Sequence, residues 1–271
     1  MSDSILNLLG LLIPVAVIVS FVLYGMFVTR LRQEGGRVRT DWVGIPDILM
    51  TLVLGGIPFG LVIYALLQPA KEPAAITQEN LISNMVFQLA VVVGVAFFLA
   101  IRRWGIVALF GLRELSLPRV IGWSFLLLLA AVPAVIVVMN VTVIALGKEA
   151  KKQDLVLHFN EMISKGDFTT ITLIVIAAAV IAPLCEEVLF RGYFYPVAKR
   201  YLGAGFGAFV TAALFAASHV NLASLPGLLV LALTFTIAYE RTGSLLVPIG
   251  MHALFNAANL SLLYLTASVR S

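Results

Sequence analysis

Runs of about 20 apolar residues recur along the whole chain, and they limit its fold more than any other feature does, because an α-helix of that length spans the hydrocarbon core of a bilayer. Hydrophobic residues make up 61% of the 271 residues and charged residues only 12%, which excludes an ordinary soluble domain. The sequence therefore predicts an all-α fold, a polytopic membrane helical bundle of about eight transmembrane helices. The candidate spans are residues 6–28, 47–67, 82–101, 120–146, 169–195, 203–219, 225–239 and 244–267.

Three features of the rest of the sequence bound the interpretation. The first apolar run is longer than the hydrophobic region of a signal peptide and no basic segment precedes it, so we expect a retained helix. The polar stretch from Lys148 to Asp167 intersperses apolar residues with charges, which predicts a loop or an interfacial helix. The net charge of +4 is modest and no basic face lies outside the connections, so we expect no nucleic-acid partner.

The distribution of Lys and Arg predicts the orientation of the bundle. The odd-numbered connections carry eleven of these residues and the even-numbered connections and the C-terminus carry six, with Arg191 left out because it lies inside a span. Cytoplasmic connections are enriched in Lys and Arg. The count therefore predicts that the connections around Arg32, Arg103 and Arg200 face the cytoplasm, and that those around Glu79 and Lys152 face outward.

Ionisable residues are concentrated in the fifth predicted span. The segment 182–192 reads APLCEEVLFRG and places two acids and an arginine in an apolar helix. A charged residue at a membrane helix centre costs about 2.5 to 3.5 kcal/mol on insertion scales, so three together require pairing or a polar cavity. Glu187 and Arg191 are four residues apart and share a helix face, whereas Glu186 points about 100° away from Glu187. We expect Glu187 to neutralise Arg191, Glu186 to stay available for chemistry, and Pro183 to kink the helix nearby.

Two further polar insertions follow in later spans. Phe215 and His219 lie one helical turn apart at the end of the sixth span, so Phe215 is placed to wall the His219 ring. His252 and Asn256 are also four residues apart and project from one face of the eighth span. A rise of 1.5 Å per residue puts the three groups at about 14 to 24 Å from their helix ends. Those depths differ, so we expect chain breaks at Pro196 or Gly203, or helix tilt, to bring the groups together.

Together these motifs resemble a known family. Glu-Glu-x-x-x-Arg at 186–191, Phe-x-x-x-His at 215–219 and His-x-x-x-Asn at 252–256 are similar to the three motifs of the CPBP (Abi) intramembrane glutamic endopeptidases, which include the type II CAAX prenyl proteases. The resemblance covers roughly residues 170–260. It implies an intramembrane endopeptidase (a hydrolase) in which the following residues act: Glu186 as general base, His219 as its partner, His252 and Asn256 as the oxyanion hole, and Glu187 and Arg191 in support.

The resemblance also sets the expected domain organisation and partners. We expect one membrane domain, in which residues 1–168 supply four helices plus a polar loop and residues 169–271 supply the catalytic core helices. The expected partners are the lipid bilayer and a peptide or protein substrate at the membrane, with a lipidated substrate implied by analogy only. We expect a multi-pass protein of the cell (plasma) membrane.

Other chemistries stay open from the residues alone. Two histidines and two glutamates are also ligands for zinc, but the histidines lie on different predicted helices, unlike a zincin motif, so we expect no cofactor and disfavour zinc. Cys185 is the single cysteine and is a weak candidate nucleophile, because a lone membrane cysteine usually packs as a small hydrophobe. A non-catalytic family scaffold or immunity protein is a further alternative. A transporter is disfavoured, because the first four spans show no counterpart of the later motifs.

Overall fold

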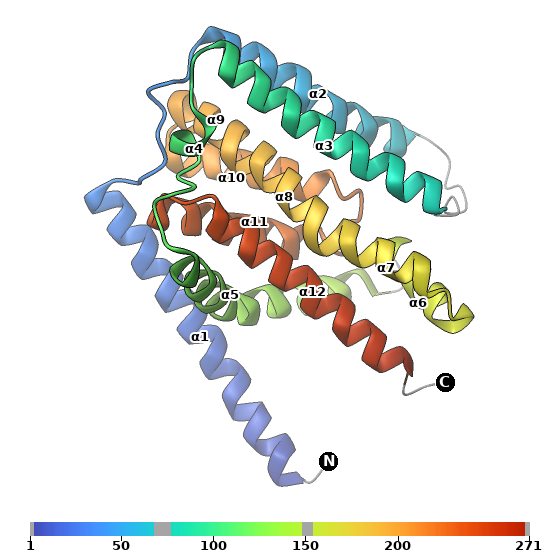
Figure 1. Ribbon diagram of the computed structural model, residues 1–271. Helices are drawn as coiled ribbons and strands as arrows, with labels where there is room; N and C mark the ends of the chain where they lie inside the picture. The colour runs from blue at the N-terminus through green and yellow to red at the C-terminus, as the bar shows by residue number, and fades with distance from the viewer. Residues whose placement is uncertain (1–2, 68–76, 148–153, 269–271) are drawn as a thin grey trace.

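The computed structural model describes residues 3–67, 77–147 and 154–268 (Figure 1), and throughout these residues the regular structure is helical. The α-helices are α1 (Asp3–Glu34), α2 (Ile45–Leu67), α3 (Gln78–Ile101), α4 (Ile106–Leu109), α5 (Leu117–Leu146), α6 (Asp154–Lys165), α7 (Phe168–Ile176), α8 (Ala182–Glu187), α9 (Tyr195–Leu202), α10 (Ala204–Ala217), α11 (Leu225–Thr242) and α12 (Leu246–Ser268). Two π-helical segments, η2 (Ala177–Ile181) and η3 (Val188–Phe194), join α7, α8 and α9. The prediction of a helical membrane bundle is confirmed.

Each predicted span coincides with a helix or a run of helices. Among the residues that the structure describes, five segments are long and apolar enough to cross a membrane by length and composition: Pro14–Glu34, Gln78–Ile101, Leu117–Leu146, Phe168–Leu202 and Leu246–Ala267. Shorter apolar helices cover Ile45–Gly56 and Ala204–Ala217. The chain is therefore an integral, multi-pass membrane protein, while eight as the number of crossings stays a prediction. So does the division of the membrane domain at residue 168.

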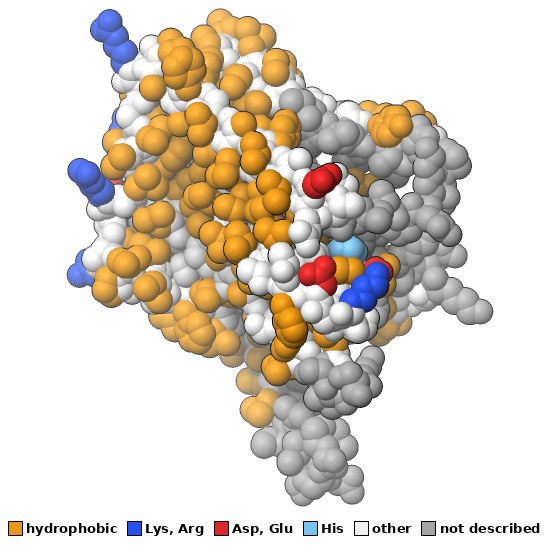
Figure 2. All heavy atoms as spheres, turned by 45° about the vertical axis from the view of Figure 1, so that its right-hand side comes forward, with side chains coloured by type: hydrophobic (Ala, Val, Ile, Leu, Met, Phe, Trp, Pro, Cys, Tyr) orange, Lys and Arg blue, Asp and Glu red, His pale blue; other side chains and the backbone are white. Residues whose placement is uncertain are grey.

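The surface agrees with a lipid environment. Large apolar side chains such as Phe97, Phe125 and Leu129 are well exposed on α3 and α5. Figure 2 shows hydrophobic side chains spread over much of one face, with Lys and Arg projecting at its left edge. In water this exposure would favour aggregation, whereas in a bilayer it contacts lipid tails.

The odd-numbered connections meet at one end of the bundle, on the left in Figure 1. Glu240, near the end of α11, is buried and accepts hydrogen bonds from the Tyr195 hydroxyl (2.5 Å), the Lys199 ammonium (2.6 Å) and the Val38 N–H (3.1 Å). Leu245 N donates to Phe110 O (2.9 Å), which joins two more of these connections. The arrangement fits the alternation that the orientation prediction requires, but the side that this end faces stays a prediction.

A second buried carboxylate, Asp47 near the start of α2, ties the same end together. Asp47 forms an ion pair with Arg102 at the end of α3 and accepts hydrogen bonds from the Tyr193 hydroxyl (3.1 Å) and the Gly44 N–H (2.7 Å). Tyr193 belongs to η3 and Tyr195 to α9. The helical run that carries the Glu-Glu motif is therefore anchored to α2 and α11 through these two tyrosines.

The segment predicted as a loop or an interfacial helix contains the helix α6. Its Phe159 and Met162 are buried against Ile171, Ile174 and Leu260 of α7 and α12. Glu161 and Lys165 stay outside and form an exposed ion pair (2.6 Å). One face of α6 therefore packs on the bundle. The expectation of a helix is confirmed, and its interfacial position stays a prediction.

The long fifth span begins after α6 with a helix cap. The Asp167 side chain accepts hydrogen bonds from the Thr170 N–H (3.0 Å) and the Thr170 hydroxyl (2.6 Å). These bonds hold the pKa of Asp167 below its usual range, because they favour the charged carboxylate. Helical backbone then continues to Leu202 and breaks at Gly203, whose φ of 80° suits glycine. The predicted break at Gly203 is confirmed. The alternative break at Pro196 is wrong, because the proline fits in the first turn of α9.

Candidate active site

The Glu-Glu motif lies in an unusual helix. Glu186 and Glu187 end the six-residue α8, which has π-helical segments on both sides, and Pro183 lies in the first turn of α8. The helix continues through Pro183, so the proline is accommodated by a change of winding. π-helical segments are rare and occur often at functional sites, because the extra residue re-aims side chains and leaves backbone carbonyls free.

Glu187, Arg191 and His252 form a buried polar triad. The carboxylate Oε1 of Glu187 lies 2.7 Å from Nη1 of Arg191 and 2.9 Å from Nδ1 of His252. The three residues are 0%, 1% and 4% exposed, so their charges can be balanced only by one another and by nearby dipoles. The predicted Glu187–Arg191 pairing is present, and the structure adds His252 to it.

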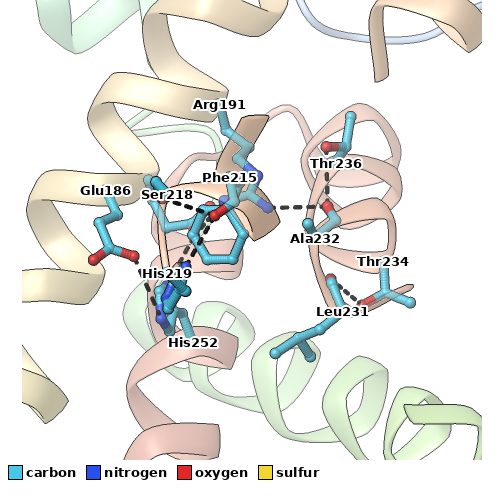
Figure 3. Close-up of polar contacts among 11 residues, drawn as sticks. Glu186, Arg191, Phe215, Ser218, His219, Leu231, Ala232, Thr234, Thr236 and His252 are labelled. Carbon is cyan, nitrogen blue, oxygen red and sulfur yellow. Dashed lines mark hydrogen bonds and ion pairs between the residues drawn. The ribbon is translucent and has the colours of Figure 1, made fainter. Parts of the chain in front are cut away.

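Arg191 is fixed from several further directions. Its Nη2 donates to the carbonyl oxygen of Ala232 on α11 (3.0 Å). Its guanidinium lies over the rings of Phe215 (4.6 Å) and Phe235 (5.2 Å), a favourable cation–π arrangement. Figure 3 shows the guanidinium reaching past Phe215 toward the Ala232 carbonyl. The arginine is therefore held in place and locks α10 and α11 to the Glu-Glu helix.

Glu186 is less enclosed than its neighbour and points toward His252 (Figure 3). Its side chain is 26% exposed, and its Oε2 lies 3.9 Å from Nε2 of His252. Within the described residues this buried oxygen has no hydrogen-bond partner. A separation of 3.9 Å is too long for a direct hydrogen bond, but one water molecule at about 2.8 Å from each atom would bridge it.

His219 lies just after α10, next to the ring of Phe215. Its Nδ1 is 2.9 Å from the Phe215 carbonyl oxygen, and the two ring centroids are 4.9 Å apart. The His252 ring contacts the same phenylalanine, with centroids 5.7 Å apart. The predicted wall of His219 is present, and Phe215 joins the two histidines. These ring contacts of His219 are to Phe215, whereas the imidazole beside Glu186 is that of His252.

Asn256 reaches a different part of the fifth span. Its Nδ2 donates to the carbonyl oxygen of Ala178 in η2 (2.7 Å). One of the two amide hydrogens is therefore used, and the second stays available. His252 and Asn256 leave α12 on one face as predicted, but their first contacts, Glu187 and Ala178, lie in separate turns of the neighbouring helix.

Sequence reasoning missed several residues that build this region. Phe235 and the Ala232 carbonyl hold Arg191 from α11, and neither residue type signals such a role in a sequence. The acids Asp47 and Glu240 did carry a signal, because each lies next to an apolar run. Their partners are far away in sequence, so helical spacing could not identify them.

Comparison with known proteins identifies proteins that the chain is similar to. The chain matches the family model of the type II CAAX prenyl endopeptidase Rce1-like proteins over residues 168–258, which contain α7 to most of α12 and every predicted site residue. It is 30% identical over 174 residues to an uncharacterized 24.3 kDa protein of Escherichia coli, an alignment that covers 62% of this chain and 73% of that protein. No solved structure matches the chain significantly.

The fold and the site together define a helical membrane bundle with a buried cluster of ionisable side chains. The chain belongs to the CPBP family through its Rce1-like domain, and is therefore a CAAX-protease-like intramembrane protease. Within the described parts of the chain, no cluster of three or more His, Cys, Asp or Glu side chains has the arrangement of a metal site.

Proposed function

We propose that the chain is a glutamic-type endopeptidase that hydrolyses a peptide bond in or near the membrane with water activated by Glu186. The observation that carries the proposal is the 3.9 Å separation of Glu186 Oε2 and His252 Nε2, a distance at which one water molecule can hydrogen-bond to both the carboxylate and the imidazole. Attack by such a water needs a base within hydrogen-bond reach, and Glu186 is the acid of the motif that Arg191 does not neutralise.

In the proposed reaction, Glu186 accepts a proton from the water molecule while the water oxygen bonds to the scissile carbonyl carbon, which places negative charge on the carbonyl oxygen. Collapse of the tetrahedral intermediate breaks the C–N bond, and Glu186 gives the proton to the leaving nitrogen. The products are a carboxylic acid and an amine, and transfer of the acid proton to the amine then gives a carboxylate and an ammonium group. His219 acts as the partner of Glu186 in these transfers, while His252 and Asn256 stabilise the oxyanion.

The orientation of the His252 ring supports its role. Glu187 holds Nδ1 of the ring at 2.9 Å, so Nε2 is the nitrogen that faces Glu186. The free amide hydrogen of Asn256 supplies a second donor.

The finer assignments belong to the same proposal. A mechanism in which Glu186 activates water needs no cofactor, so we propose none and no zinc. The substrate is a peptide or protein segment at the membrane, with lipidated peptides as the class that the family suggests. The location proposed is the cell (plasma) membrane, with no nucleic-acid partner.

The test is cleavage of a fluorogenic membrane peptide by purified protein in proteoliposomes. We expect Glu186→Gln to abolish cleavage while the circular dichroism spectrum and melting temperature stay at parent values, because glutamine keeps the shape and removes the base. Glu161→Gln is the matched control, since Glu161 lies on the outer face of α6 and pairs with Lys165. Cleavage by the Glu186→Gln protein at the parent rate would exclude the mechanism. Absence of cleavage by the parent protein on every peptide tried would favour a non-catalytic scaffold.

A further inference from the structure

Three amide side chains line one side of α3. Asn80, Asn84 and Gln88 recur every four residues, so they form a ladder along one helix face, here called the amide ladder. Asn80 and Asn84 are exposed, whereas Gln88 is partly buried. Gln88 falls seven residues from both Leu81 and Val95, which are buried, so it lies in the packed stripe of the helix. The ladder therefore runs from the start of α3 into its packed face.

Gln88 is in an unfavourable position for a residue that only packs. Its Oε1 is buried and has no hydrogen-bond partner among the described residues. An amide left unpaired in an apolar environment is destabilising, because it loses the hydrogen bonds that it made to water. Buried polar groups in proteins are almost always paired, so an unpaired group calls for an explanation, such as a ligand.

The amide ladder leads toward the level of Glu186. α3 runs in the same direction as the fifth span (Figure 1). The two meet where Gln78 donates to Thr170 (2.9 Å) and where the rings of Phe98 and Tyr193 lie 6.4 Å apart. In these two contacts, the residue of the fifth span has a number 92 or 95 higher than that of its partner in α3. Gln88 is therefore level with residues 180–183, and the next rung, at Val92, would be level with residues 184–187.

The spacing of the rungs matches an extended peptide. Four residues of α-helix rise about 6 Å, and two residues of an extended chain span about 6.6 Å. Each carboxamide offers two N–H donors and a carbonyl acceptor, so it can pair with a backbone N–H or C=O whatever the peptide sequence. Such pairing also supplies the backbone bonds that an unwound segment loses in hydrocarbon.

We propose that the amide ladder binds the backbone of an extended substrate segment and leads it to Glu186. The inference rests on the proposed function for its final step, because the scissile bond is then the one that lies one rung beyond Gln88. Gln88, the innermost rung, contributes most because its amide is the most desolvated. Recognition of backbone by side-chain amides gives little dependence on substrate sequence.

Binding is measured separately from cleavage to test this. The protein carries Glu186→Gln and is placed in nanodiscs, and the probe is a fluorescent, valine- and threonine-rich membrane peptide with a central Gly-Gly pair. Gln88→Leu keeps a similar size and removes both polar groups. Asn140→Leu is the matched control, because Asn140 is an exposed amide on α5 that bonds its own helix at the Ile136 carbonyl (2.8 Å).

We expect Gln88→Leu to raise the peptide Kd by about fivefold or more, the change expected for one hydrogen bond. Asn140→Leu should leave the Kd unchanged. N-methylation of alternate peptide amides should weaken binding to the parent and have a smaller effect on the Gln88→Leu variant. A Kd within twofold of the parent for Gln88→Leu, or equal effects of N-methylation on both proteins, would overturn the proposal and leave the ladder as a water path. If Glu186 proves dispensable for cleavage, the proposed mechanism fails while this binding result still stands.

Discussion

At the scale of single residues, Glu187 is the point where the charges of the site converge. Its Oε1 contacts both Arg191 and His252, while its buried Oε2 has no hydrogen-bond partner in the described part of the chain. Removal of this carboxylate therefore affects a guanidinium and an imidazole at once. Glu187 is best understood as a positioning residue, because it holds the ring that faces Glu186.

Glu187→Ala is expected to destabilise the protein by about 3 to 5 kcal/mol, because it leaves Arg191 as an unpaired buried cation. Unfolding in mixed micelles measures this. The double variant Glu187→Leu with Arg191→Met should recover most of the stability, since an apolar pair of similar volume replaces the ions, but it should not recover cleavage. A single variant as stable as the parent would show that the pair contributes nothing to folding.

The sequence predicts this residue-level picture only in part. Spacing of four residues on a helix identified the Glu187–Arg191 pair without any structure. It could not identify His252 as the third member, because that contact joins residues 65 positions apart and depends on how two helices pack. The rings that enclose Arg191 were equally hidden, since a phenylalanine in an apolar helix looks like any core residue.

At the scale of elements, α12 is joined to the fifth span at two levels. His252 bonds Glu187 in α8, and Asn256 bonds the Ala178 carbonyl in η2. The predicted spans agree with the helices because apolar length depends only on local sequence. The π-helical segments were not predicted, since their winding is set by packing and by the side chains that satisfy the displaced carbonyls.

Asn256→Ala should reduce kcat by about 100-fold or more while leaving a measurable rate, the usual result of deleting one oxyanion donor. It should also cost about 1 kcal/mol of stability through the lost bond to Ala178. Parallel measurement of kcat and of thermal unfolding separates the effect on catalysis from the effect on stability. A fall in stability without any fall in kcat would make Asn256 purely structural.

His219→Ala is expected to come close to abolishing cleavage in the same measurement of kcat.

At the scale of the whole molecule, the arginine-rich connections form one end of the bundle, and the positive-inside rule predicts that this end is cytoplasmic. In a Cys185→Ala background, a cysteine at Arg103 should react with an impermeant thiol reagent only from the cytoplasmic side, and one at Glu79 only from outside. Labelling of the cysteine at position 79 from the cytoplasmic side alone would show that the orientation is the reverse of the predicted one. Lys152, on the predicted outer side, lies outside the described residues.

The central claim, that Glu186 activates water without a metal, is tested most directly by cleavage after metal removal. Purified protein is dialysed exhaustively against chelator, its metal content is measured, and hydrolysis of the membrane peptide is followed for the parent and for Glu186→Gln. The account predicts full parent activity at negligible metal content and none for the variant. Loss of parent activity on dialysis, restored by stoichiometric zinc alone, would contradict it and identify a metalloprotease.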